Sequence, residues 1–497
     1  MEDLRKLVQI VTNRGQKSFP LLEIKNKSTN KETDLFLRIK KGDLQTDEQA
    51  AEKLYGSSPE DYRLKMLKSR LRKKLLNHLF FLDFSDERLK ISHRYEQESL
   101  SLLYQGRTLM NEGEHKISAK LLQNALKLAT EAEITSIIIS CLEALVINYS
   151  LTLRSNLFYK TRKQLKQYRE LAAFEYEAED LYYSAKLELN KSVLAKRKYL
   201  ATMTASVDRL RALWEKTNSA NIFEQYYILN IIKQELTGDF EEILKITALS
   251  EKLLLQGKIN KKRFDIRFNK YISVYAYLRV KDYDKGLAYA QTNASAFNRS
   301  TINWFAFMEN YMLLAMHAGQ YELAARLFNE VSENSFFKKI NPNAQERWML
   351  YSSYLYLVNP SKELLKKSTY KKLLASIPEY SKDKQGFNVA ILVLQFLYYV
   401  QAEDQDMLSY LIEGLKKYAG RHLQENFSKR SVYFFKLLVT VVKADLDYVE
   451  SQKKGRVLYE KLQATPVPGD AYAEIEIIPY EQLWAIVLKT LEELEHK

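Results

Sequence analysis

The segment from Phe307 to Val331 constrains the fold more than any other stretch of the chain. Four residues spaced three or four apart mark one face of a first helix: Met308, Tyr311, Met312 and Ala315. Gly319 follows this helix at a position where glycine adopts a positive φ at low cost. The same spacing marks a second helix: Ala324, Leu327, Phe328 and Val331. The segment therefore predicts two antiparallel helices joined by a tight turn.

This hairpin resembles the tetratricopeptide repeat (TPR), which places small residues where its two helices meet and a large apolar residue one turn later. Ala324 and Phe328 occupy these positions here. A second copy runs from Leu102 to Ala125, with small, small, large and small residues in order: Gly106, Ser118, Leu122 and Ala125. A third runs from Lys270 to Ala290 and uses Gly286 as its close-contact residue, but it departs from the pattern at Val274.

The rest of the chain repeats this hairpin pattern at a longer period. First helices are expected to start near residues 94, 132, 220, 262, 301, 343, 387 and 428. The later spacing exceeds the roughly 34 residues of a standard TPR. Only 14 glycines and 8 prolines occur among 497 residues, which favours long helices. We therefore predict an all-α fold, a right-handed α-solenoid of stacked antiparallel helical hairpins with elongated TPR-like repeats.

Three domains are expected. Residues 1–91 form a basic helical domain, residues 92–464 form the solenoid, and residues 465–497 form a loop or extended segment with a C-terminal capping helix. In the last of these, the alternation of Ala473 to Ile477 predicts a short strand or an extended arm that could lie in the solenoid groove. Pro479 is expected to begin the final helix, which reaches about Glu495.

The N-terminal domain contains two predicted capping boxes, Thr29 with Glu32 and Thr46 with Gln49. Ser58-Pro59 is expected to start a long helix whose apolar stripe consists of leucines: Leu64, Leu67, Leu71, Leu75, Leu79 and Leu82. The other faces of this helix are basic, with Arg63, Lys65, Lys68, Arg70, Arg72, Lys73 and Lys74. Thr46 to Lys74 resembles a helix-turn-helix, which implies that the basic helix contacts nucleic acid. A solvated face or an acidic protein partner would also explain these cations.

The middle of the chain alternates in charge. A basic cluster comprises Lys160, Arg162, Lys163, Lys166 and Arg169. An acidic cluster follows, with Glu175, Glu177, Glu179 and Asp180. Such blocks are usually solvated helix faces that pair with their neighbours, and this is our interpretation of both.

No pattern for catalysis, cofactor binding or metal binding occurs in the sequence. The single cysteine, Cys141, excludes an intramolecular disulfide and lies in an apolar run, which predicts a core residue. The six histidines form no closely spaced pair, and the phosphate-binding GxxxxGK[ST] and GxGxxG motifs are missing, as is GxSxG. We therefore predict no enzyme, no cofactor and no metal.

The net charge of +14 attracts polyanions without identifying them. The chain opens with acidic residues where a signal peptide would carry lysines, and its apolar runs fall short of the ~20 residues that span a bilayer. We expect a cytoplasmic protein without a membrane partner. The 34 tyrosines could line a groove or pack between helices, and packing is the favoured interpretation.

Two functional hypotheses remain. The resemblance to TPR proteins implies a scaffold or adaptor that binds a protein or peptide in its groove. The candidate groove residues are Arg267, Asn269, Tyr275, Asn310 and Tyr311. The alternative is a nucleic-acid-binding regulator that uses the basic N-terminal helix for contact and the solenoid for sensing or dimerisation.

Overall fold

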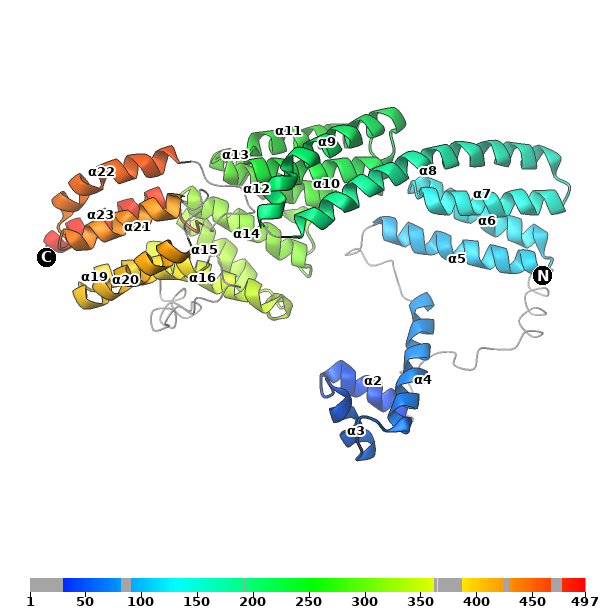
Figure 1. Ribbon diagram of the computed structural model, residues 1–497, viewed down its shortest axis with the longest axis horizontal. Coiled ribbons are helices and arrows are strands. Elements are labelled where there is room, and N and C mark those ends of the chain that lie inside the picture. The colour runs from blue at the N-terminus through cyan, green and yellow to red at the C-terminus, as the bar shows by residue number, and fades with distance from the viewer. Residues whose placement is uncertain are drawn as a thin grey trace. The chain divides into compact units, whose positions relative to one another are not determined.

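The computed structural model describes residues 30–81, 91–191, 193–361, 364, 387–422, 429–465 and 476–496. Within these ranges every regular element is a helix and no strand occurs, which confirms the predicted all-α class (Figure 1). The chain divides into two compact units, residues 1–169 and residues 170–497. Each unit is described by itself.

The described part of the first unit begins with three short helices, α2 (Lys31–Lys41), α3 (Asp47–Tyr55) and α4 (Tyr62–His78), and a 3-10 turn at Leu79–Phe81. Their small core consists of the buried residues Leu35, Leu44, Ala50, Ala51, Leu64, Leu67 and Leu71. The predicted leucine stripe of α4 is only half buried, because Leu75 and Leu79 are 37% and 54% exposed. Leu82 lies outside the described residues.

The predicted helix starts in this domain have three different outcomes. Thr46 caps α3 as expected, since its hydroxyl accepts the backbone N–H of Gln49 at 3.4 Å. Thr29 lies outside the described residues, and Asn30 caps α2 instead by accepting from the backbone N–H of Glu32. The prediction that the long helix starts at Ser58-Pro59 is wrong. The backbone forms a turn between Ser58 and Asp61, and the Asp61 carboxylate caps α4, which begins at Tyr62.

Two helical pairs complete the first unit, α5 (Ile91–Asn111) with α6 (His115–Glu131), and α7 (Thr135–Leu151) with α8 (Ser155–Leu189), which continues past residue 169. Gly106 is the close-contact residue that the sequence predicts, since a Cβ added there would lie 2.8 Å from the Leu122 side chain. Cys141 is fully buried, and burial raises the pKa of its thiol to about 12. These findings confirm the predicted hairpin and the core position of the cysteine.

The second unit continues the series of helices. Its first part contains α9 (Val193–Thr217), α10 (Ala220–Thr237), α11 (Phe240–Leu255), α12 (Ile266–Arg279), α13 (Tyr283–Asn293), α14 (Ile302–His317), α15 (Tyr321–Ser332) and α16 (Pro342–Val358). Its second part contains α19 (Phe387–Gln401), α20 (Gln405–His422), α21 (Lys429–Lys443), α22 (Tyr448–Ala464) and α23 (Tyr480–Glu495). The first helices start within four residues of the predicted positions throughout the chain. The hydrophobic periodicity therefore located these hairpins correctly.

The hairpin of α14 and α15 has the predicted packing. The eight residues assigned to its contact faces are all buried, and Gly319 has the expected positive φ of 71°. Each of the following helices packs on its neighbour, so one continuous core extends from Val274 to Leu491. The helix α23 begins directly after Pro479, as predicted, and packs against α19, α21 and α22. Stacking of successive hairpins thus supplies the core that no hairpin could form alone.

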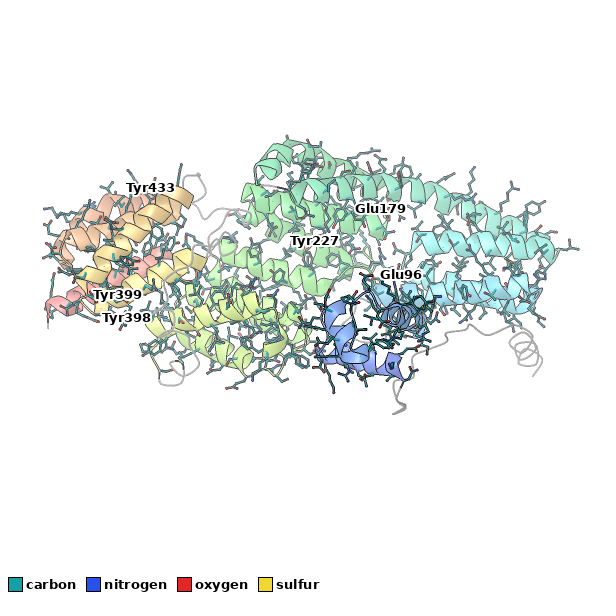
Figure 2. The ribbon with its side chains drawn as sticks, turned by 60° about the horizontal axis from the view of Figure 1, so that its bottom comes forward. Glu96, Glu179, Tyr227, Tyr398, Tyr399 and Tyr433 are labelled. Atoms are coloured by element: carbon teal, nitrogen blue, oxygen red, sulfur yellow. The ribbon has the colours of Figure 1, made fainter. Side chains whose placement is uncertain are left out.

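Tyrosines contribute mainly to this packing in the second unit. Tyr227 on α10 is 2% exposed and its ring meets Phe223 and Phe264, whereas Tyr398 and Tyr399 on α19 and Tyr433 on α21 are partly buried against the continuous core (Figure 2). Their rings fill the space between helices while their hydroxyl groups can still find hydrogen-bond partners.

Candidate functional site

A pocket lies on the first helices of three consecutive hairpins in the second unit, α12, α14 and α16. Its volume is about 490 Å³, within the range of small-molecule and peptide side-chain sites. The wall from α12 carries Tyr271, Ile272, Tyr275, Leu278 and Arg279, and the wall from α14 carries Ala306, Glu309, Asn310, Leu313 and His317. The remaining residues are Glu235, Lys281, Tyr283, Arg347, Tyr351, Arg430, Glu476 and Pro479.

Local sequence signals position these three helices. The Asp265 carboxylate caps α12 by accepting the backbone N–H of Arg267 at 3.0 Å. The Thr301 hydroxyl caps α14, and Asn341 caps α16 just before Pro342 in its first turn. Each cap sets where its helix begins, and packing against neighbouring helices then sets which side chains face the pocket.

An ion pair joins α14 to α16 at the pocket wall. Nε of Arg347 donates to Oε1 of Glu309 at 2.9 Å, and a second guanidinium N–H donates to Oε2 at 3.2 Å. The Tyr351 hydroxyl donates to the same carboxylate at 2.7 Å. Burial, with the adjacent negative charge of Glu309, raises the pKa of Tyr351 well above its usual value. This tyrosine is therefore a neutral donor at physiological pH.

His317 connects α14 to the segment before α23. Its Nε2 lies 2.7 Å from the Glu476 backbone oxygen, and a carbonyl can only accept, so Nε2 carries the proton. Burial lowers the pKa of His317 to about 4, because the cationic ring would lose its hydration. The Gln482 side chain donates to the His317 carbonyl at 2.6 Å. A neutral histidine thus holds the C-terminal segment against the pocket.

Arg430 of α21 anchors the same segment from the other side. Its side chain is 2% exposed and donates to both oxygens of the Glu476 carboxylate at 2.5 and 3.0 Å and to Glu481 at 2.8 Å. It also donates to the backbone carbonyls of Leu462 and Thr465. Burial disfavours the charged form of Glu481, but the hydrogen bond and the charge of Arg430 outweigh burial and lower the pKa of Glu481. All five N–H groups of the guanidinium have acceptors.

The pocket lining is nearly balanced in charge. Four cations (Arg279, Lys281, Arg347 and Arg430) face three carboxylates (Glu235, Glu309 and Glu476). Arg279 lies over the rings of Tyr275 and Phe240, and Lys281 lies 3.9 Å from Glu481. This arrangement offers hydrogen bonds and aromatic surface to a ligand, without a strong field of one sign.

The structure brings two of the five candidate groove residues into the pocket, Tyr275 and Asn310. Asn269 is fully buried outside the pocket lining, where it accepts from the Tyr227 hydroxyl and donates to the Thr247 carbonyl. Arg267 pairs with Asp265 at 3.1 Å outside the lining, and Tyr311 is 6% exposed in the core. Asn269 and Tyr311 occupy interior faces of α12 and α14, which sequence spacing alone could not distinguish from groove faces.

Sequence reasoning missed Arg279, Glu309, His317, Arg347 and Arg430. A partial signal existed, because Tyr271, Tyr275 and Arg279 follow one another at intervals of four along α12, as do Ala306 and Asn310 along α14. No local signal could reveal the pairing of Arg430 with Glu476, because 46 residues separate them.

The N-terminal basic residues are largely engaged with acids of their own domain. Arg63 pairs with Asp61, Lys65 with Glu60 and Lys68 with Asp47. Arg70 and Lys74 both pair with the buried Glu32. Lys73 also has an interaction partner, and Arg72 lies at the edge of an apolar groove that Leu35 and Leu75 line. The positive field of α4 is therefore weaker than the sequence alone suggests.

Comparison with protein-family models, with curated proteins and with solved structures found no match for this chain. Within the described ranges, no helix combines the length and apolar character needed to cross a bilayer. In the same ranges no three His, Cys, Asp or Glu side chains gather as a metal ion would require. The fold and the pocket, rather than a relative, define this chain as an all-α protein of stacked helical hairpins with a pocket lined by apolar, aromatic and charged side chains.

Proposed function

We propose that this protein is a non-catalytic, cytoplasmic scaffold or adaptor that binds a peptide segment of a partner protein in the pocket of α12, α14 and α16. The proposal includes a right-handed, TPR-like course of the hairpins, which would place these first helices on the concave side. The observation that carries it is the 490 Å³ pocket, where tyrosine rings and Asn310 stand beside the Arg347–Glu309 pair.

The chemistry of the lining supports binding over catalysis. The Tyr351 hydroxyl is held as a neutral donor and His317 as a neutral ring engaged with a backbone carbonyl. Aromatic surface with fixed donors and acceptors suits an extended peptide, because the backbone of such a segment needs hydrogen bonds and its side chains need apolar contact. The near balance of charge favours a peptide of low net charge.

The experiment selects peptides from a displayed random library on the full-length protein and measures their affinity by fluorescence anisotropy. Ala306→Trp should weaken the selected peptides at least tenfold, since Ala306 lines the pocket and the indole would occupy it. Ala212→Trp places the same side chain on the exposed side of α9 and serves as the matched control.

Peptides that bind Ala306→Trp as tightly as the wild type would place the binding surface elsewhere and contradict the proposal. Far-UV circular dichroism and melting curves of both variants separate loss of binding from loss of folding. Asn310→Ala, which removes one amide without adding volume, should weaken the same peptides by a smaller factor.

A further inference from the structure

The first turns of α8 carry a dense basic surface. Over residues 155–169 there are five Lys or Arg residues and no Asp or Glu, and all five cations are exposed. Arg169 pairs with Glu143 on α7 at 2.7 Å. In the described part of the chain, no ion pair or hydrogen bond engages the others: Lys160, Arg162, Lys163 and Lys166. This differs from α4, whose cations are mostly paired.

Helical periodicity explains why these cations all lie off the buried face of α8. Thr161 and Leu165 are buried, and Phe158 and Tyr168 are partly buried against the α5–α7 core. The opposite side must therefore carry the remaining residues, including Tyr159, which is 66% exposed. From Lys160 to Arg169 the surface extends about 14 Å along the helix axis.

Exposed aliphatic side chains adjoin the basic surface where α7 turns into α8. Leu153 is 88% exposed at the tip of this turn, where it holds a positive φ of 54°. Leu151 and Ile147 are 60% and 51% exposed on the last turns of α7. They follow Glu143 at intervals of four, so the Glu143–Arg169 contact places them beside the Arg169 edge of the basic surface.

We propose, in place of the sequence-based expectation of no membrane partner, that this side of the first unit is a peripheral docking surface for an anionic lipid membrane, with Leu153 and Leu151 entering the interface and the α8 cations contacting lipid phosphates. Basic residues near an acidic leaflet and exposed aliphatic groups strengthen such binding together. A nucleic acid would use the cations alone and would leave the three aliphatic side chains in water. The first 169 residues contain 31 Lys and Arg against 21 Asp and Glu, an excess that favours an anionic partner, and the exposed aliphatic side chains favour the membrane as that partner.

The test is flotation of the full-length protein with vesicles of phosphatidylcholine alone or with about 30% phosphatidylserine, with the bound fraction measured at rising salt. We expect binding to the anionic vesicles only. Lys160→Gln with Lys163→Gln and Lys166→Gln should weaken it roughly 100-fold, about fivefold for each basic residue. Leu151→Gln with Leu153→Gln should also weaken it, at least tenfold.

Two matched variants control for charge and for apolar exposure. Lys453→Gln with Lys454→Gln and Arg456→Gln removes three exposed cations from α22, and Leu255→Gln removes a leucine that is 89% exposed on α11. Neither should change vesicle binding. Circular dichroism should show all variants folded, because each substituted side chain is exposed.

Absence of binding to anionic vesicles, or equal binding to neutral ones, would overturn the proposal. A second outcome would also overturn it. The protein would bind single-stranded DNA, duplex DNA or RNA at physiological salt, the triple glutamine variant would lose this binding, and the leucine variant would keep it. That result would assign the surface to nucleic acid. The peptide pocket lies in the second unit, so neither outcome bears on it.

Discussion

Arg430 in the second unit and the cations of α8 in the first unit carry the same charge in opposite environments. Arg430 is 2% exposed and all its N–H groups have acceptors, whereas four cations of α8 are exposed to solvent and pair with no acid in the described part of the chain. A buried guanidinium must be fully paired because its desolvation is costly, but an exposed cation keeps its hydration and remains available to a partner. The difference shows that the cations behind the net charge of +14 are of two kinds: some are buried and paired within the fold, and others are exposed and available to a partner.

The largest loss of folding stability is expected when Arg430 is substituted. Arg430→Met keeps much of the side-chain volume but leaves the Glu476 carboxylate without its cation and Glu481 with only Lys281 at 3.9 Å, which should lower the free energy of unfolding by about 3–5 kcal/mol. Chemical denaturation at pH 7 measures it. Arg430→Met with Glu476→Met and Glu481→Met should recover part of the loss. A cost below about 1 kcal/mol for the single variant would show that the ion network stabilises little.

The next effect is a pH dependence due to His317. Its pKa is about 4 in the folded protein and near 6.5 when exposed, so the unfolded chain binds more protons between these values. Stability should therefore fall by up to about 2 kcal/mol from pH 7 to pH 5 and by about 1 kcal/mol more to pH 4, and the loss through this group should level off below pH 4.

The measurement compares denaturation at both pH values for the wild type and His317→Gln, whose side chain does not titrate. His317→Gln should reduce the pH dependence, while His496→Gln, at an exposed site, should not. A wild-type pH dependence that persists in His317→Gln would assign it to other groups.

A smaller effect is expected at Glu309, whose ion pair with Arg347 is only partly buried. The side chains are 17% and 30% exposed, so solvent screens part of their attraction. Glu309→Gln should lower the free energy of unfolding by about 1–2 kcal/mol, because the amide oxygen can still accept from Tyr351 but the charge is lost. Comparing the thermal unfolding of Glu309→Gln with that of Arg430→Met tests whether the loss of stability increases with the burial of the ion pair. Equal costs for the two variants would contradict that relation.

The smallest effect on stability is expected on α8. Lys160→Gln, Lys163→Gln and Lys166→Gln should each change the free energy of unfolding by no more than about 0.5 kcal/mol, because each side chain is exposed and unpaired within the described residues. Denaturation of the single variants measures this directly. A loss above about 1 kcal/mol would indicate that these cations support the fold and would end the contrast with Arg430.

Local signals predicted the hairpins well. The spacing of Ala324 and Phe328 and the glycine at position 319 identified a pair of helices that the structure contains, and Gly106 meets Leu122 as expected. The predicted start of one helix was wrong where two local capping signals competed. Ser58-Pro59 has the composition of a helix start, but Asp61 offers the stronger cap and the helix begins after it.

The pocket was predicted only in part. Tyr275 and Asn310 face it, but Asn269 lies in the interior, where Tyr227 and Thr247 satisfy its amide. A polar residue on a first helix can face either the groove or a buried network, and the choice depends on neighbours from α10 and α11 that are distant in sequence. No local pattern in the sequence therefore predicts which of the two environments a polar residue will face.

The amino-acid sequence by itself determined the all-α class, the starts of the hairpins and the buried position of Cys141, because apolar residues at intervals of three and four require a core on one face. Only the tertiary structure decided which cations are paired. Arg430 meets Glu476 across 46 residues, and Glu32 pairs with Arg70 and Lys74 of another helix, while four α8 cations meet no acid among the described residues: Lys160, Arg162, Lys163 and Lys166. The physical reason is that helix formation depends on near neighbours along the chain, whereas charge pairing depends on which helices the packing brings together.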